Sequence, residues 1–260
     1  MKILLVVLFG FFSNHVFAQD ADASFDPPTL SAAVAARYAI YAMVSSNAYH
    51  NPDRKTFAVE KLGWVQVDGN GKKTGSPTRI RKSGLAYDIF EKQDSNEVIF
   101  AFRGTDSKED YLTANLAIWP FSLQYTQAKK YFAAYLKSHP EKKVTVTGHS
   151  LGGGLALSMS VRYGVDAVVF DSSPRIFDGL GDKHLPASRI LVYEGGEILA
   201  VARKVWRKIF EAVPRENIYK ASFDFGGANR HRSDHLARGL LELGATVDST
   251  LVPVLEAMAK

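Results

Sequence analysis

Residues 144–154 read VTVTGHSLGGG, and this stretch decides the fold. The β-branched run at 143–147 favours a short buried strand, and residues 155–162 (LALSMSVR) are compatible with a helix. Between them Ser150 lies in a Gly-x-Ser-x-Gly turn, whose glycines let the strand and the helix approach closely. This order predicts a nucleophile elbow, a strained turn that exposes the serine hydroxyl.

Strand-like and helix-like segments alternate on both sides of the elbow. Apolar periodicity predicts an N-terminal helix within 30–45, a hairpin over 64–81, strands at 85–91, 98–102, 167–170 and 189–193, and helices at 124–138 and 232–243. Strands that alternate with helices predict an α/β fold, in which a mostly parallel sheet carries helices on both faces.

The chain of 260 residues divides into a leader and one domain. Lys2 precedes an apolar run at 3–12, and Val16-Phe17-Ala18 places Val16 and Ala18 at the positions where signal peptidase needs small residues. We therefore expect a cleaved signal peptide at 1–18, a single domain at 19–260, and export to the periplasm or the medium. The run is too short for a spanning helix, and later segments do not approach about 18 uninterrupted apolar residues.

Composition narrows the class of protein further. The sequence contains no cysteine, which excludes disulfides, thioether lipid anchors and cysteine chemistry. Loss of Lys2 with the leader changes the formal charge from +5 to +4. This mild basic excess suits contact with anionic lipid headgroups, although a mixed solvated surface explains it as well. We find no nucleic-acid-binding module and expect no nucleic-acid partner.

A serine nucleophile needs a histidine base, and the base needs a carboxylate that fixes its tautomer. The order typical of an elbow protein is serine, acid, histidine. Of the downstream histidines, His231 directly precedes the helix at 232–243 and is preferred. His235, one turn into that helix, is the reserve, and His149 adjoins the nucleophile and is expected to point elsewhere.

The carboxylate has two candidates of equal merit in the residue pattern. Asp171 ends the first strand after the elbow, and Glu197 follows the second. In open parallel sheets, binding and catalytic sites form at the carboxyl ends of the strands. Glu194 closely abuts its strand and is less suitable.

Two backbone amides are needed to hold the oxyanion of the tetrahedral intermediate. The elbow supplies the amide of Leu151, the residue after the nucleophile. The second amide must come from an earlier loop, and Gly104 would let the amide of Thr105 face the site after the strand at 98–102.

Two motifs together resemble the class 3 lipase family, the fungal-type triacylglycerol lipases and their bacterial relatives. They are FRGT at 102–105 and GHSLGG at 148–153. The resemblance covers about 64–243 and extends through SPR at 173–175, EIL at 197–199 and His231 with the Leu-Ala pair at 236–237.

The resemblance implies an α/β-hydrolase variant whose triad is Ser150, His231 and Glu197. It implies Thr105 as an oxyanion donor beside Leu151, and neither a metal nor an organic cofactor. Glu197 stands where most members carry aspartate, so its longer side chain must start from a slightly withdrawn backbone. Asp171 remains the reserve acid.

Two amphipathic segments bear on substrate choice. Residues 107–121 (SKEDYLTANLAIWPF) occupy the place of the family's mobile lid helix, and a helix packed permanently on the sheet is the alternative. Residues 203–213 have the pattern of a basic amphipathic helix, which we expect either to rest on anionic lipid or to pack its apolar face into the core.

We therefore expect an exported serine hydrolase that acts on lipid esters and touches a lipid surface transiently. Alternatives of the same class are a phospholipase A acting on anionic membrane lipids and a short-chain esterase. An alternative of another class is a catalytically inactive lipase-fold binding module.

Overall fold

The computed structural model describes residues 26–104, 119–173, 185–197, 199, 212–225 and 230–258. Within these residues, no helix combines the length and the apolar character that crossing a bilayer requires. Several predicted features lie outside them: the leader at 1–18, Thr105, residues 107–118 of the lid expected at 107–121, and most of the basic stretch at 203–213.

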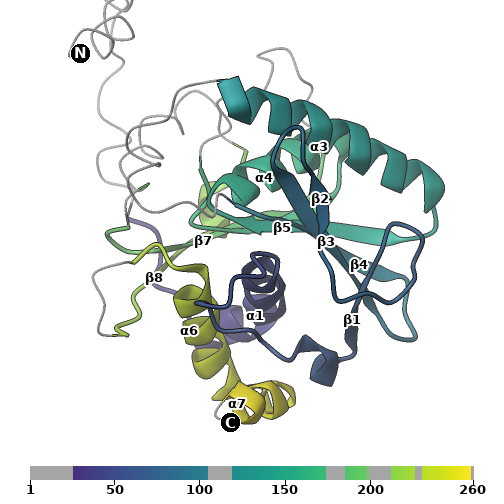
Figure 1. Ribbon diagram of the computed structural model, residues 1–260. Helices are drawn as coiled ribbons and strands as arrows, with labels where there is room; N and C mark the ends of the chain where they lie inside the picture. Colours follow the sequence, from purple (N-terminus) through teal and green to yellow (C-terminus); the bar gives the residue numbers. More distant parts are fainter. Residues whose placement is uncertain are drawn as a thin grey trace, which may run out of the picture.

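An eight-stranded mixed sheet forms the centre of the molecule (Figure 1). Its order is β1-β3-β4-β5-β6-β7-β8, and β2 pairs with β3 beside this path. The strands are β1 (Trp64–Val67), β2 (Thr78–Ile80), β3 (Leu85–Lys92), β4 (Glu97–Phe102), β5 (Lys143–His149), β6 (Asp166–Phe170), β7 (Arg189–Glu194) and β8 (Ile218–Ala221). The five strands from β4 to β8 run parallel, and β1, β2 and β4 pair antiparallel with β3.

Helices cover both faces of the sheet (Figure 1). One face carries α3 (Trp119–Ser138) and α4 (Leu151–Tyr163), and the other carries α1 (Ala32–Asn47), α6 (Ser233–Ala245) and α7 (Val252–Met258). Short 3-10 turns lie at Val59–Leu62, Arg215–Asn217 and Ser249–Leu251. The predicted α/β fold with helices on both faces is confirmed.

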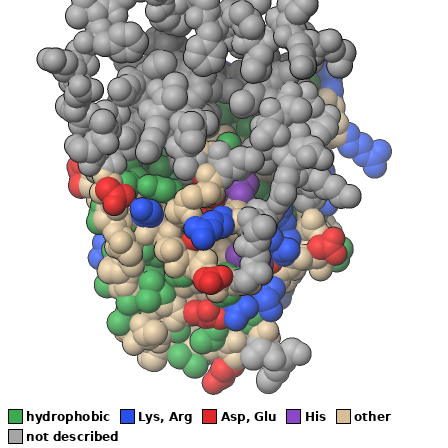
Figure 2. Space-filling model, turned by 90° about the vertical axis from the view of Figure 1, so that its left-hand side faces the viewer, with side chains coloured by type: hydrophobic (Ala, Val, Ile, Leu, Met, Phe, Trp, Pro, Cys, Tyr) green, Lys and Arg blue, Asp and Glu red, His purple; other side chains and the backbone are tan. Residues whose placement is uncertain are grey.

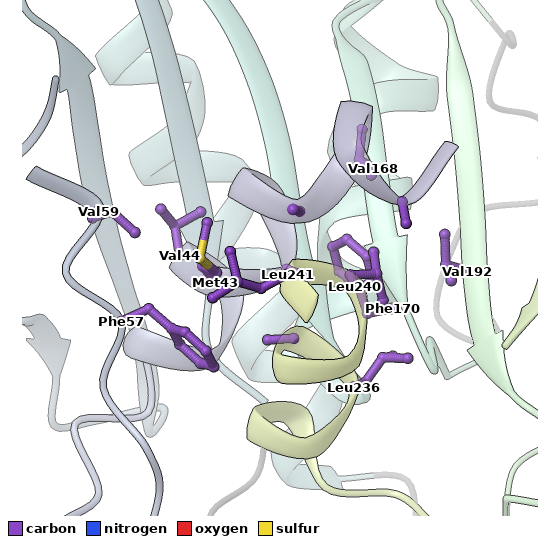
Figure 3. Packing of buried hydrophobic residues seen from close by; sticks show 14 of the residues in the cluster. Met43, Val44, Phe57, Val59, Val168, Phe170, Val192, Leu236, Leu240 and Leu241 are labelled. Atoms are coloured by element: carbon purple, nitrogen blue, oxygen red, sulfur yellow. The ribbon is translucent and has the colours of Figure 1, made fainter. Parts of the chain in front are cut away.

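Each face of the sheet has its own apolar core, because parallel strands are buried on both sides. Figure 3 shows the core beneath α1 and α6, where Met43, Leu236 and Leu240 pack towards Phe170 and Val192 of the sheet. The opposite core is rich in aromatic rings from β3, β4 and α3, including Tyr87, Phe100, Phe102, Phe132 and Tyr135. The two cores fix the sheet between them.

The predicted hairpin over 64–81 is confirmed next to its turn and differs in the rest of its pairing. Val67 bridges Lys73, and backbone hydrogen bonds from Asp68 to Lys72 and from Thr74 to Gln66 flank this bridge, whereas β1 and β2 both pair with β3. The long apolar strand β3 offers more pairing surface than the polar stretch after Gly71. The structure also contains β8 and α7, which the sequence analysis did not predict.

The register of the parallel strands brings their carboxyl ends together. Phe102 of β4 lies opposite Gly148 of β5, and His149 lies opposite Phe170 of β6. Phe170 in turn lies opposite Val192 of β7. The loops that follow these strands therefore meet at one edge of the sheet, which is where open α/β sheets carry their sites.

Candidate active site

Ser150 lies in a strained turn between β5 and α4. Its backbone has φ 57° and ψ −126°, a region that residues with a side chain rarely adopt. The Ser150 N–H donates to the Phe170 carbonyl at 3.0 Å, and its carbonyl accepts from the Ser173 N–H at 3.0 Å. These bonds to the end of β6 and the loop after it hold the turn in place.

Gly148 and Gly152 make this turn possible because they allow backbones to touch. A Cβ at Gly148 would lie 2.4 Å from the Gly152 carbonyl carbon and oxygen. A Cβ at Gly152 would lie 2.2 Å from the Phe102 carbonyl oxygen. The predicted reason for both glycines, close approach of strand and helix, is thus seen directly.

Three of the predicted side chains form one hydrogen-bonded chain. His231 Nε2 lies 2.9 Å from Ser150 Oγ, and His231 Nδ1 lies 2.8 Å from Glu197 Oε2. In this geometry His231 carries its proton on Nδ1 and donates it to Glu197, and its Nε2 accepts from the Ser150 hydroxyl. Ser150 is only 3% exposed, so the predicted exposure of its hydroxyl is not seen; the His231 ring lies against it.

Glu197 reaches His231 from a tight turn after β7. Gly196 has φ 78°, and the Glu197 N–H donates to the Glu194 carbonyl at 3.3 Å. The Leu199 N–H donates to Glu197 Oε2 at 2.8 Å and helps to fix the carboxylate. The Glu197 side chain is fully buried, while that of His231 is 11% exposed.

Asp171, the reserve acid, lies at the end of β6 and faces a different histidine. Its Oδ2 is 3.4 Å from His149 Nε2, and its Oδ1 accepts the Glu194 N–H at 2.8 Å. His149 Nδ1 lies 2.9 Å from the Tyr49 hydroxyl. The expectation that His149 points away from Ser150 fits these contacts, but its proximity to His231 was missed: the two ring centroids are 4.7 Å apart.

His235, the reserve histidine, lies on α6 and lines a small cavity with Glu194, Phe223, Asp224, Phe225, Arg230 and Leu236. Its ring packs against Phe225 at 5.6 Å between centroids, and burial lowers its pKa. Burial also raises the pKa of Glu194 to about 7, although the bond from the Phe223 N–H opposes the shift. The Ser150 hydroxyl therefore contacts His231, and His235 lines the neighbouring cavity.

The expected oxyanion site is described in part. Leu151 is the first residue of α4, so its N–H has no carbonyl one turn earlier in the helix to bond. Thr105 lies outside the described residues. Gly104, just before it, packs against the elbow, since a Cβ there would lie 2.6 Å from the His149 carbonyl oxygen.

One group of side chains has metal-ligand chemistry within the described part of the chain. Atoms of His149, Asp171 and His231 lie within 4.8 Å of one another. The same side chains already engage Tyr49, Glu194, Ser150 and Glu197. We therefore do not assign them as metal ligands.

The fold and this site define the class: the protein is an α/β hydrolase of the lipase-like superfamily. The sequence profile of the phospholipase-like family, described as a Tle-like phospholipase domain, matches residues 40–192. The chain belongs to this family. The resemblance to class 3 lipases holds at the level of the superfamily.

Solved structures of fungal lipases are similar in fold. A triacylglycerol lipase from Penicillium expansum is 15% identical, with 75% of this chain and 82% of that chain covered and a TM-score of 0.50. The Lip2 lipase from Yarrowia lipolytica is 14% identical, with 81% and 86% covered and a TM-score of 0.48. Lipase II from Rhizopus niveus is 16% identical, with 69% and 79% covered and a TM-score of 0.48. The search of curated protein sequences finds no significant match.

Proposed function

We propose that the protein is a serine hydrolase that cleaves carboxylic ester bonds of lipids through an acyl-enzyme on Ser150. One observation carries this proposal: the chain from Ser150 Oγ through His231 to Glu197 Oε2, with contacts of 2.9 and 2.8 Å. The serine stands at the start of a helix in an elbow, which is the geometry of a nucleophile with its base and orienting acid.

In the first half of the reaction, Ser150 Oγ attacks the ester carbonyl while His231 Nε2 takes its proton. The carbonyl oxygen becomes an oxyanion, which the amides of Leu151 and Thr105 would stabilise. The positive charge on His231 is balanced by Glu197, whose carboxylate holds Nδ1. His231 then gives the proton to the departing alcohol, and the acyl group remains on Ser150.

In the second half, a water molecule takes the place of the alcohol. His231 removes its proton, the hydroxide oxygen attacks the acyl carbon, and the Ser150 oxygen leaves with the proton that His231 returns. The products are a free fatty acid and the resting enzyme. Each half therefore uses the same three side chains.

A phospholipase A is the second candidate, and membership of the phospholipase-like family favours it. Such an enzyme would release a fatty acid and a lysophospholipid by the same steps.

Acidic and basic side chains lie side by side in the described part of the face shown in Figure 2. This mixed surface would give only modest attraction to anionic lipid. The apolar run at 3–12 supports our proposal that the protein is exported.

The test compares fatty-acid release from phosphatidylglycerol vesicles and from tributyrin by the purified protein, with Ser150→Ala as the control. Release from either substrate, lost in the variant, supports a lipid-ester hydrolase. Release from phosphatidylglycerol with lysophospholipid as co-product selects the phospholipase A. Folded wild-type protein that cleaves neither ester contradicts the proposal and favours the inactive binding module.

A further inference from the structure

A second histidine-carboxylate pair lies beneath the base of the proposed triad. His149, the last residue of β5, and Asp171, which follows β6, are both almost fully buried. Their facing atoms, His149 Nε2 and Asp171 Oδ2, are 3.4 Å apart. The proposed hydrolytic steps use neither side chain.

The surrounding donors indicate the protonation state of this pair. Asp171 Oδ1 accepts the Glu194 N–H at 2.8 Å, and Oδ2 lies 3.4 Å from His149 Nε2 without a short hydrogen bond between the two atoms; we take the group as a carboxylate that faces this ring nitrogen. With its proton on Nε2, His149 accepts the Tyr49 hydroxyl at Nδ1, 2.9 Å away. The pair then has a neutral imidazole and a net charge of −1. The negative charge of Asp171 also helps burial to raise the pKa of Glu194.

This charge lies close to the position where positive charge develops in the reaction. The ring centroids of His149 and His231 are 4.7 Å apart, with 47° between the ring planes. One ring nitrogen of each histidine and one carboxylate oxygen of Asp171 fall within 4.8 Å of one another. An opposite charge at about 4–6 Å favours the charged form of a titratable group, and burial weakens the screening by water.

We propose that Asp171 and His149 are positioning residues: the His149 ring supports the His231 ring, and the Asp171 carboxylate stabilises His231 in its protonated form. Glu197 orients the base through Nδ1, and Asp171 adds a second negative charge beneath the ring. This inference rests on the proposed hydrolase function and deepens it.

Other charged groups around His231 are accounted for by their own contacts. Arg232 binds Asp234 at 2.8 Å, and Arg230 donates to the Gly195 carbonyl at 2.9 Å. Among the described residues, the elements around His231 (the ends of β5, β6 and β7, the start of α6 and the loop after α1) carry these titratable or charged groups: Tyr49, Arg54, His149, Asp171, Glu194, Glu197, Arg230, Arg232, Asp234 and His235. Of these carboxylates, Asp171 is the one aimed at His149.

The experiment measures kcat/KM and kcat against pH for wild type and Asp171→Asn, with the better of the two lipid substrates. Without the charge we expect the acid limb of the profile to move down by about one pH unit and the plateau of kcat to fall about tenfold. KM should change little, because neither residue is expected to touch the substrate. A merely structural role would lower the plateau and leave the limb in place.

Asp88→Asn is the matched control. Asp88 lies on β3, is 2% exposed and has its Oδ2 2.6 Å from Nε2 of His50, whose side chain is 22% exposed, so it forms another carboxylate-histidine pair. We expect its acid limb to coincide with that of the wild type. If Asp171→Asn is folded and its limb also coincides with the wild type, the inference is overturned.

A measurement on the unmodified protein protects the test against a variant that does not fold. Nitrogen-15 NMR of the histidine rings should find His149 neutral and protonated on Nε2 at pH 7. A positively charged His149 at that pH would cancel the Asp171 charge and overturn the inference. Failure of the proposed function looks different, because the wild type itself would then release no fatty acid.

Discussion

Substitution of Gly152 by alanine tests whether the elbow depends on the backbone contact beneath it. The new Cβ would lie 2.2 Å from the Phe102 oxygen, 2.8 Å from the Arg103 carbonyl carbon and 2.9 Å from the Gly104 nitrogen. All three are backbone atoms, which do not swing aside as a long side chain does. Carbon contacts are normally about 3.5 Å or more, so α4 and the end of β4 must separate by about 1 Å.

This separation should affect stability and activity together. Overpacking of this kind destabilises a protein by about 1–3 kcal/mol. Ser150, two residues earlier, would move relative to His231 and lose its contact of 2.9 Å. A misplacement of about 1 Å lowers catalytic rate on the order of a hundredfold. We therefore expect a lower urea midpoint and a kcat for ester hydrolysis reduced about a hundredfold.

Gly69→Ala is the control for the glycine-to-alanine change itself. A Cβ at Gly69 would meet no atom within 4 Å, and the residue does not need a positive φ. Its urea midpoint and kcat should match those of the wild type. A folded Gly152→Ala protein with wild-type kcat and an unchanged midpoint would refute the close-contact argument.

Three further variants test the site and the core. Burial raises the pKa of Glu194 to about 7 in the fold; the unfolded chain releases this proton at lower pH, so the wild type loses stability as pH rises from about 4 to 8. Urea unfolding should show Glu194→Gln gaining up to about 3 kcal/mol on the wild type over that range, with solvent screening reducing the gain, and a gap independent of pH would contradict this cause. Leu240→Ala truncates a fully buried side chain between α6 and the sheet and should lower the free energy of unfolding by about 2–5 kcal/mol. Its control is Val247→Ala, at a position that is 60% exposed, which should change this free energy by less than about 0.5 kcal/mol. Glu197→Gln should lower kcat by about a thousandfold or more with little change in KM, and a kcat within threefold of wild type would remove Glu197 from the relay.

The elbow was predictable because its determinants are local. A β-branched strand, the glycines around Ser150 and a helix-forming run occur within about 20 residues, and each requires the same backbone path. The order of strands and helices followed from periodicity for the same reason. The predicted hairpin shows the limit, since its arms pair with each other next to the turn and otherwise pair with β3.

The acid and the buried pair depend on contacts between distant residues. Asp171 and Glu197 both follow the carboxyl ends of parallel strands, so residue pattern alone could not separate them, and the family resemblance was needed to prefer Glu197. The structure places Glu197 against His231 and Asp171 against His149. Tyr49 and His149 are 100 positions apart in the sequence, and no local sequence pattern predicts their contact.

The most direct test of the account is covalent labelling of Ser150 by a fluorophosphonate, followed by intact mass and peptide mapping. We expect one label per molecule on Ser150 in the wild type, no label in Ser150→Ala, and much slower labelling in Glu197→Gln. Folded wild-type protein that takes up no label, or that carries it on another residue, would contradict the claim that Ser150, His231 and Glu197 form a working relay.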